Sequence, residues 1–118
     1  MVKIFEETPI IYSILQYFDK SDLLKLTLVN KKWRKVAYFY IINLYKDKKE
    51  LYLHDNKLKK IPKELGKLTN LEYLFLNGNH LEEIPKELGN LTNLKELYLN
   101  GNNLETIPKE LGSILMSI

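Results

Sequence analysis

A repeat of 23 residues in the second half of the chain constrains its fold more than any other feature. Leu51, Leu74 and Leu97 are spaced 23 residues apart, and the same spacing relates further sets of three positions. Those sets begin at Leu53, Asn56, Leu58, Ile61, Pro62, Leu65 and Gly66. The unit reads L-x-x-L-x-L-x-x-N-x-L-x-x-I-P-x-x-L-G-x-L-x-x. A period of this length is typical of arrays in which each unit buries its apolar residues against its neighbours.

Each part of the unit has a physical reason. The L-x-L alternation has the period of two expected of a short strand with one face inward. The Asn that follows stands at a tight bend, where its side-chain amide can satisfy backbone groups of neighbouring coils that would otherwise be buried unpaired. Ile-Pro then predicts an extended turn, and the Gly of Leu-Gly predicts the backbone angles needed to return to the next strand.

This pattern resembles the leucine-rich repeat family over residues 48 to about 114. The resemblance implies a right-handed solenoid with a parallel sheet on its concave side. The first coil departs from the pattern at Lys48, where later coils have Leu71 and Leu94. After Gly112 the pattern ends in an apolar tail, residues 113–118, which leaves the last coil without a polar cap. We expect this tail to fold over the last coil or to pair with another copy, giving weak self-association through the C-terminus.

The first half is not repetitive and predicts three short helices. Residues 10–18 place apolar side chains at helical spacing after Pro9, which suits the first helical position. A second helix follows Ser21 and Asp22 as its cap and ends near residue 30. A third helix runs to about Tyr45, and its apolar face is formed by Trp33, Val36, Ala37, Tyr40, Ile41 and Leu44.

Two segments of this half resemble the F-box: residues 14–26, ILQYFDKSDLLKL, and residues 29–34, VNKKWR. The family usually has Leu-Pro slightly upstream, where this chain has two glutamates followed by Thr8 and Pro9. The resemblance implies that the helices dock on a Skp-type adaptor and through it on a cullin ubiquitin ligase, while the repeats hold the target protein. The docking residues that it implies are Pro9, Ile10, Ile14, Leu15, Leu23, Leu24, Val29 and Trp33.

The same apolar side chains have a second interpretation as the core of a helical cap, because an apolar stripe is also what a helix buries within its own domain. Three short helices within residues 8–45 are too small to bury the whole stripe, which favours docking. The predicted architecture is α+β. A three-helix F-box over residues 1–46 precedes repeats over residues 47–118, divided at about 47–70, 71–93 and 94–118.

The outward positions of the strands form the predicted substrate surface on the concave face. Tyr52, Phe75 and Tyr98 fall in one column, and exposed aromatic rings supply contact area at a low cost in conformational entropy. The same rings can instead stabilise the sheet by stacking, and both roles can hold together. The full predicted surface is Glu50, Tyr52, His54, Tyr73, Phe75, Asn77, Glu96, Tyr98 and Asn100, with Lys49, Glu72 and Lys95 as a further column. Strands about 4.8 Å apart give room for a short peptide segment.

Composition excludes several classes of function. The 118 residues contain no Cys, which rules out disulfides, thiolate metal sites and ligases that carry ubiquitin as a thioester. His54 and His80 have no ligand-spaced partner, so we expect them to be solvated and expect neither a metal nor another cofactor. No catalytic constellation is visible, so the chain is not expected to be an enzyme. The basic run over residues 31–35 lies in a chain with a single Arg, which argues against nucleic acid as a partner.

The sequence shows neither a membrane span nor a secretory signal. We therefore expect a cytoplasmic or nuclear protein in a reducing compartment of a eukaryotic or host cell. The predicted function is that of a substrate-recognition subunit of a cullin ubiquitin ligase, with a Skp adaptor and an unidentified target protein as partners. The alternative is a leucine-rich-repeat scaffold whose helical cap has no adaptor partner.

Overall fold

The computed structural model describes residue 22, residues 31–112 and residues 114–117. Within them, helix α3 (Lys31–Tyr45) and the repeats belong to two compact units whose boundary in the sequence falls after Leu44, and each is described by itself. The helices predicted over residues 10–18 and 21–29 lie outside the described residues, apart from Asp22, which is helical and exposed. The described helices include none that is long and apolar enough to span a bilayer.

Helix α3 lies where the sequence predicts the third helix. Val36, Ala37 and Ile41 are buried and Tyr40 is half-buried. Tyr40 lies one turn after Val36 and Ile41 one turn after Ala37, as expected of a single helix face. Leu44, which the sequence places on the same apolar face, is 47% exposed in the last turn of the helix. The third predicted helix is confirmed, whereas the three-helix F-box as a whole is not shown.

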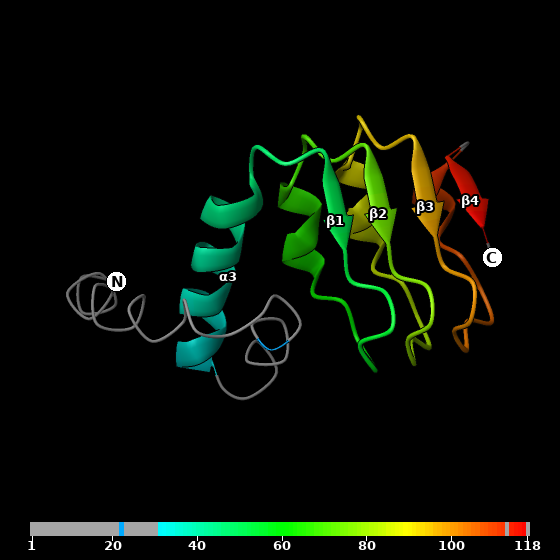
Figure 1. Cartoon of the computed structure of the whole chain (residues 1–118), viewed down its shortest axis with the longest axis horizontal. Coiled ribbons are helices and arrows are strands. Elements are labelled where there is room, and N and C mark those ends of the chain that lie inside the picture. Colours follow the sequence, from blue (N-terminus) through cyan, green and yellow to red (C-terminus); the bar gives the residue numbers. More distant parts are fainter. Residues whose placement is uncertain (1–21, 23–30, 113, 118) are drawn as a thin grey trace. The chain divides into compact units, whose positions relative to one another are not determined.

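The repeats form a four-stranded parallel sheet in the order β1-β2-β3-β4 (Figure 1). Its strands are β1 (Glu50–Tyr52), β2 (Tyr73–Phe75), β3 (Glu96–Tyr98) and β4 (Leu115–Ser117). Leu51 pairs with Leu74, and Leu74 pairs with Leu97, so the 23-residue spacing of the sequence is the register of the first three strands. The predicted parallel sheet is confirmed, with one strand more than the three complete repeats supply.

A second row of short 3-10 helices returns the chain to each new strand: η1 (Lys63–Lys67), η2 (Lys86–Asn90) and η3 (Lys109–Leu111). Neighbouring members of this row contact one another, so the coils stack at the strands and at the 3-10 helices alike. The proline before each 3-10 helix is extended, with φ −68° and ψ 144° at Pro62. This confirms the extended turn predicted from Ile-Pro.

The core lies between the two rows and is filled by the repeating leucines. Leu53, Leu74, Leu76 and Leu99 are at most 1% exposed. Burying one leucine side chain contributes about 1.5–3 kcal/mol, so these columns supply the main driving force for folding. In the last coil Leu104 and Ile107 are only half-buried, as expected at the end of a stack, whereas Leu111 remains buried.

The predicted asparagine ladder is present and joins successive coils. Asn79 is 3% exposed, and its Oδ1 accepts hydrogen bonds of 3.0 Å from the backbone N–H groups of Asn56 and Leu58 in the preceding coil. Its Nδ2 donates to the carbonyl oxygens of Leu53 at 3.0 Å and Leu76 at 2.9 Å. One buried amide thereby satisfies four backbone groups in two coils, which is the role that the sequence predicts.

The reason predicted for the glycine of the Leu-Gly pair is wrong at Gly66 and Gly89. Both have ordinary backbone angles, and the positive φ values belong to Gly112 and to two glycines of the bends after the strands. Gly66 is required by close packing instead: a Cβ there would lie 2.3 Å from the backbone oxygen of Glu87 in the next coil. A side chain at this position would therefore force the 3-10 helices apart.

The apolar tail continues the sheet, which corrects the view that the coil pattern dissolves after Gly112. Strand β4 pairs Met116 with Leu97 of β3 and so brings Met116 to the inward register, where it is half-buried. The spacing between these partners is 19 residues, whereas it is 23 between the earlier strands. Of the two fates predicted for the tail, folding onto the last coil is the one observed within the chain.

Candidate functional site

The outer side of the sheet carries the surface that the sequence singles out. In each of the first three strands the central leucine is buried and the residues on either side of it point outward. We call this surface the ladder face and define it by six residues: Glu50, Tyr52, Tyr73, Phe75, Glu96 and Tyr98. The alternation that buries the leucines therefore also fixes which side chains a partner can touch.

Three aromatic rings stack across the ladder face. The rings of Tyr52 and Phe75 have centroids 4.7 Å apart and planes at 11°, and those of Phe75 and Tyr98 are 4.6 Å apart at 7°. His54 contacts the edges of Tyr52 and Phe75 at 6.1 and 6.4 Å. Although the rings support one another, Tyr52 is 42% exposed and the other two rings are half-buried, so their edges remain available to a partner.

A carboxylate accompanies each of the two tyrosines in the stack. The hydroxyl of Tyr52 donates to Glu50, and that of Tyr98 donates to Oε1 of Glu96 at 2.9 Å. The hydrogen bond to Glu96 raises the pKa of Tyr98, because it favours the protonated phenol, and the same holds for Tyr52 beside Glu50. Tyr73 lies between the two glutamates in the register of the sheet. The ladder face thus joins aromatic rings with negative charge.

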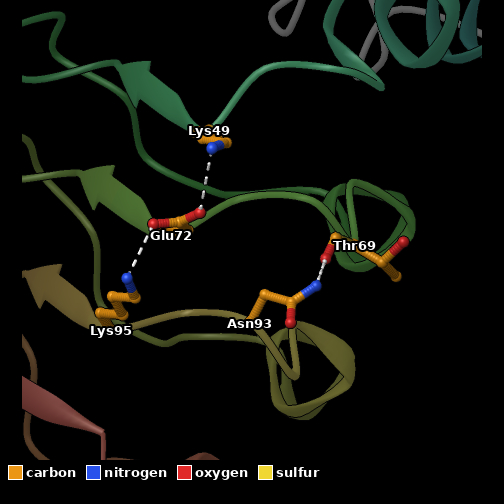
Figure 2. Close-up of polar contacts among 5 residues, drawn as sticks. All are labelled: Lys49, Thr69, Glu72, Asn93 and Lys95. Carbon is orange, nitrogen blue, oxygen red and sulfur yellow. Dashed lines mark hydrogen bonds and ion pairs between the residues drawn. The ribbon is translucent and has the colours of Figure 1, made fainter.

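A row of alternating charges precedes the strands (Figure 2). Glu72 forms ion pairs with Lys95 at 3.0 Å and with Lys49 at 3.8 Å. Its hydrogen bond with Lys95 lowers the pKa of the Glu72 carboxyl and raises that of the Lys95 amine. Farther from the strands, Asn93 Nδ2 donates to the backbone oxygen of Thr69 at 2.8 Å and so joins the second coil to the first. Glu72 is thus shared between two lysines, and the row keeps one net positive charge, unlike the acidic ladder face.

The remaining predicted surface residues follow the strands. His54 and Asn100 are exposed, and Asn77 is half-buried. His80, predicted to be solvated like His54, is also exposed. In the part of the chain that the structure describes, no cluster of His, Asp or Glu side chains is arranged to hold a metal ion.

The predicted Skp-docking residues fall almost entirely outside the described residues. Seven of the eight are Pro9, Ile10, Ile14, Leu15, Leu23, Leu24 and Val29, and none of these is described. Trp33 lies within the bounds of α3. Their role therefore stays a prediction.

Sequence reasoning missed Ser117 as a member of the outer surface. It pairs with Tyr98 across β3 and β4 and is exposed. The signal that could have found it is the alternation of Ile114, Met116 and Ile118 in the tail, which has the period of a strand.

Comparison with known proteins agrees with this fold. Residues 48–104 match the family model described as "Leucine rich repeat". A solved structure of a leucine-rich-repeat protein from Leptospira interrogans is similar, with 38% sequence identity and a TM-score of 0.56. The similarity covers 73% of this chain and 20% of the Leptospira chain, so this chain spans about a fifth of that protein. No curated protein matches the chain.

Proposed function

Since residues 48–104 are leucine-rich repeats, which serve as protein-interaction scaffolds, we propose that this chain binds an extended segment of a partner protein on its ladder face. The observation that carries the proposal is the stack of Tyr52, Phe75 and Tyr98. Large, rigid rings are the residue type that most often dominates binding energy in protein interfaces. The stack holds these rings in place before a partner arrives, so little side-chain entropy is lost on binding.

The four strands of this chain give room for a short segment of a partner. Four strands about 4.8 Å apart give a face about 15 Å across, and extended peptide rises about 3.3 Å per residue. A segment that crosses the strands would therefore contact the face with four or five residues. Such a contact is far smaller than a standard protein interface, which buries about 1,600 Å², so we expect micromolar affinity.

The test begins with a display library of random 12-residue peptides selected on the full chain. The Kd of the enriched peptides would then be measured by fluorescence anisotropy against wild type, Phe75→Ala and Glu82→Ala. Phe75→Ala removes the central ring without touching the buried leucines, and Glu82 is an exposed residue away from the strands. We expect Phe75→Ala to weaken binding at least tenfold and Glu82→Ala to leave it unchanged, with circular dichroism confirming that both fold. Selected peptides that bind Phe75→Ala as tightly as wild type would show that the ladder face is not the site.

A second, finer proposal concerns the first half of the chain: that it docks on a Skp adaptor and makes the repeats the target-binding part of a cullin ubiquitin ligase. The observation in its favour is the resemblance of residues 14–26 and 29–34 to the F-box. Helix α3 contains Trp33 of that motif and lies where the resemblance requires a helix. The competing proposal is a repeat scaffold without a ligase link.

A pull-down of a eukaryotic Skp adaptor separates these two proposals. We expect the full chain to retain the adaptor and folded Trp33→Ala and Pro9→Ala variants to lose it. A folded wild-type chain that retains no adaptor would favour the free scaffold. That result would leave peptide binding by the ladder face unaffected, because the peptide measurements need no adaptor.

A further inference from the structure

The aromatic stack ends at Tyr98, although the sheet continues for one more strand. Phe75 covers one face of the Tyr98 ring, and on the other side the residue in register is Ser117. Among the described residues Phe75 is the sole ring partner of Tyr98. One face of the last ring is therefore bordered by a side chain too small to cover it.

The space beside this ring has the dimensions of one further planar group. Successive rings in the stack are 4.6 to 4.7 Å apart, which is also the spacing of the strands that carry them. At the next step Ser117 contributes only a Cβ and a hydroxyl, and its backbone is held in place because its carbonyl oxygen accepts from the N–H of Leu99 at 2.7 Å. We call this position, above Ser117 and against the ring of Tyr98, the ring slot.

Glu96 places negative charge beside the ring slot. Its Oε1 accepts from the Tyr98 hydroxyl, and a carboxylate retains further acceptor capacity on its second oxygen. The residue in register with Glu96 on β4 is Leu115, so the adjacent strand brings no cation to this carboxylate. The nearby Lys95 is engaged with Glu72.

A planar cation satisfies the ring and the carboxylate together. The guanidinium of arginine stacks on tyrosine rings and donates several hydrogen bonds from its edge, whereas a lysine ammonium is a compact point charge that leaves a flat slot unfilled. A second aromatic ring would fill the slot but would leave the negative charge of Glu96 without a cation. We propose that the ring slot receives an arginine of the bound segment, stacked on Tyr98 and paired with Glu96.

This inference rests on the proposed function and specifies the chemistry of the partner at one end of the stack. Its test uses the peptides selected on wild type and three variants of the full chain. Ser117→Phe fills the slot with a ring, Ser117→Ala leaves it open, and Glu96→Gln keeps an oxygen for the Tyr98 hydroxyl while removing the charge. Both positions lie on the outer side of the sheet, so circular dichroism should show an unchanged fold for all three variants.

We expect the selected peptides to share an arginine whose replacement by lysine or citrulline weakens binding about tenfold. Ser117→Phe should weaken the arginine peptide to the same degree, and Ser117→Ala should leave its Kd unchanged. In Glu96→Gln the arginine peptide should lose part of its advantage over the citrulline peptide, because the ion pair is gone while the cation–π contact with Tyr98 remains.

Three results would overturn the inference. In the first, the peptides lose binding to Phe75→Ala, show no preference for arginine and bind Ser117→Phe normally. The proposed function would then stand, but without an arginine site. In the second, the peptides share an aromatic residue in place of arginine, and their binding is weakened by Ser117→Phe but not by Glu96→Gln. The slot would then bind by stacking without recognising charge. If no peptide binds wild type, the proposed function fails and the inference fails with it.

Discussion

The asparagine ladder gives a graded prediction, because three asparagines at equivalent positions do different amounts of hydrogen bonding. Asn79 is the central one, and replacing it with alanine removes the acceptor of the Asn56 and Leu58 N–H groups. The bond to Leu58 is buried and the bond to Asn56 is partly buried. A buried donor left without a partner costs about 1–3 kcal/mol, so we expect Asn79→Ala to lower the free energy of unfolding by about 3 kcal/mol.

The two outer members of the ladder should respond less. Asn102 accepts from the N–H of Leu81 in a partly buried bond, so Asn102→Ala should cost about 1–2 kcal/mol. Asn56 belongs to the first coil and donates to the carbonyl oxygen of His54 in an exposed bond, which water can replace. Asn56→Ala should therefore cost less than about 0.5 kcal/mol.

Urea unfolding followed by far-ultraviolet circular dichroism measures this order directly. With a slope of about 1.5 kcal/mol per molar urea, the midpoint of Asn79→Ala should fall by about 2 M. Because small domains have only about 5–15 kcal/mol of stability, this loss is a large share of the total, and the Asn79 variant should still fold. Asn93→Ala is the matched control, since its amide makes an exposed bond between the same coils. Equal shifts at the three ladder positions, or the largest shift at Asn56, would refute the burial argument.

Three further predictions follow from single contacts. Gly66→Ala should lower the thermal midpoint more than Gly112→Ala. A Cβ at residue 66 meets the Glu87 backbone oxygen and costs about 1–3 kcal/mol, while a Cβ at residue 112 meets open space and is strained only by the φ of 58°. The reverse order in scanning calorimetry would contradict the packing reason. Lys95 lowers the pKa of Glu72 in the folded state, so the stability contributed by this ion pair is present above the usual carboxyl pKa near 4.5 and is lost as pH falls through the lowered value. Glu72→Gln should therefore flatten the dependence of unfolding free energy on pH in that acidic range. An unchanged dependence would show that the ion pair contributes nothing. Weak self-association through the C-terminal strand should appear as a rising mass in light scattering across a concentration series, and a strict monomer at high concentration would exclude it.

The parts of the fold that depend on contacts between equivalent positions could be predicted from the sequence. In a stacked array each residue meets its counterpart one period away, so the spacing of Leu51 and Leu74 already states which residues pair across the sheet. The role of Asn79 was predictable for the same reason, because a polar residue kept in phase with buried leucines must bond to the backbone around it. The outward column of aromatic rings followed from the alternation of the strands.

Other features depend on distances that a pattern of letters does not contain. Both roles of glycine, positive φ and close approach, appear as the same letter, so the tight contact of Gly66 with the next coil could not be distinguished from a backbone bend. Leu44 fits the apolar face of its helix by spacing, yet it lies in the last turn, where a side chain can extend past the packed region. The predicted docking residues rest on the F-box resemblance alone, because the described residues include only one of them, Trp33.

The shortened last coil explains why the ladder face has an open end. The spacing between paired residues of β3 and β4 is four residues shorter than the repeat. Because side chains alternate between the two faces and four is an even number, Met116 still points inward and Ser117 outward. A shift by an odd number would have exposed Met116 on the face that carries Tyr98. The chain thus continues its sheet but places Ser117, a small residue, at the position where the earlier strands have an aromatic ring. The same change that breaks the sequence pattern sets Ser117, and not another ring, beside the last tyrosine and next to Glu96, which is why the proposed arginine site lies where the periodicity ends.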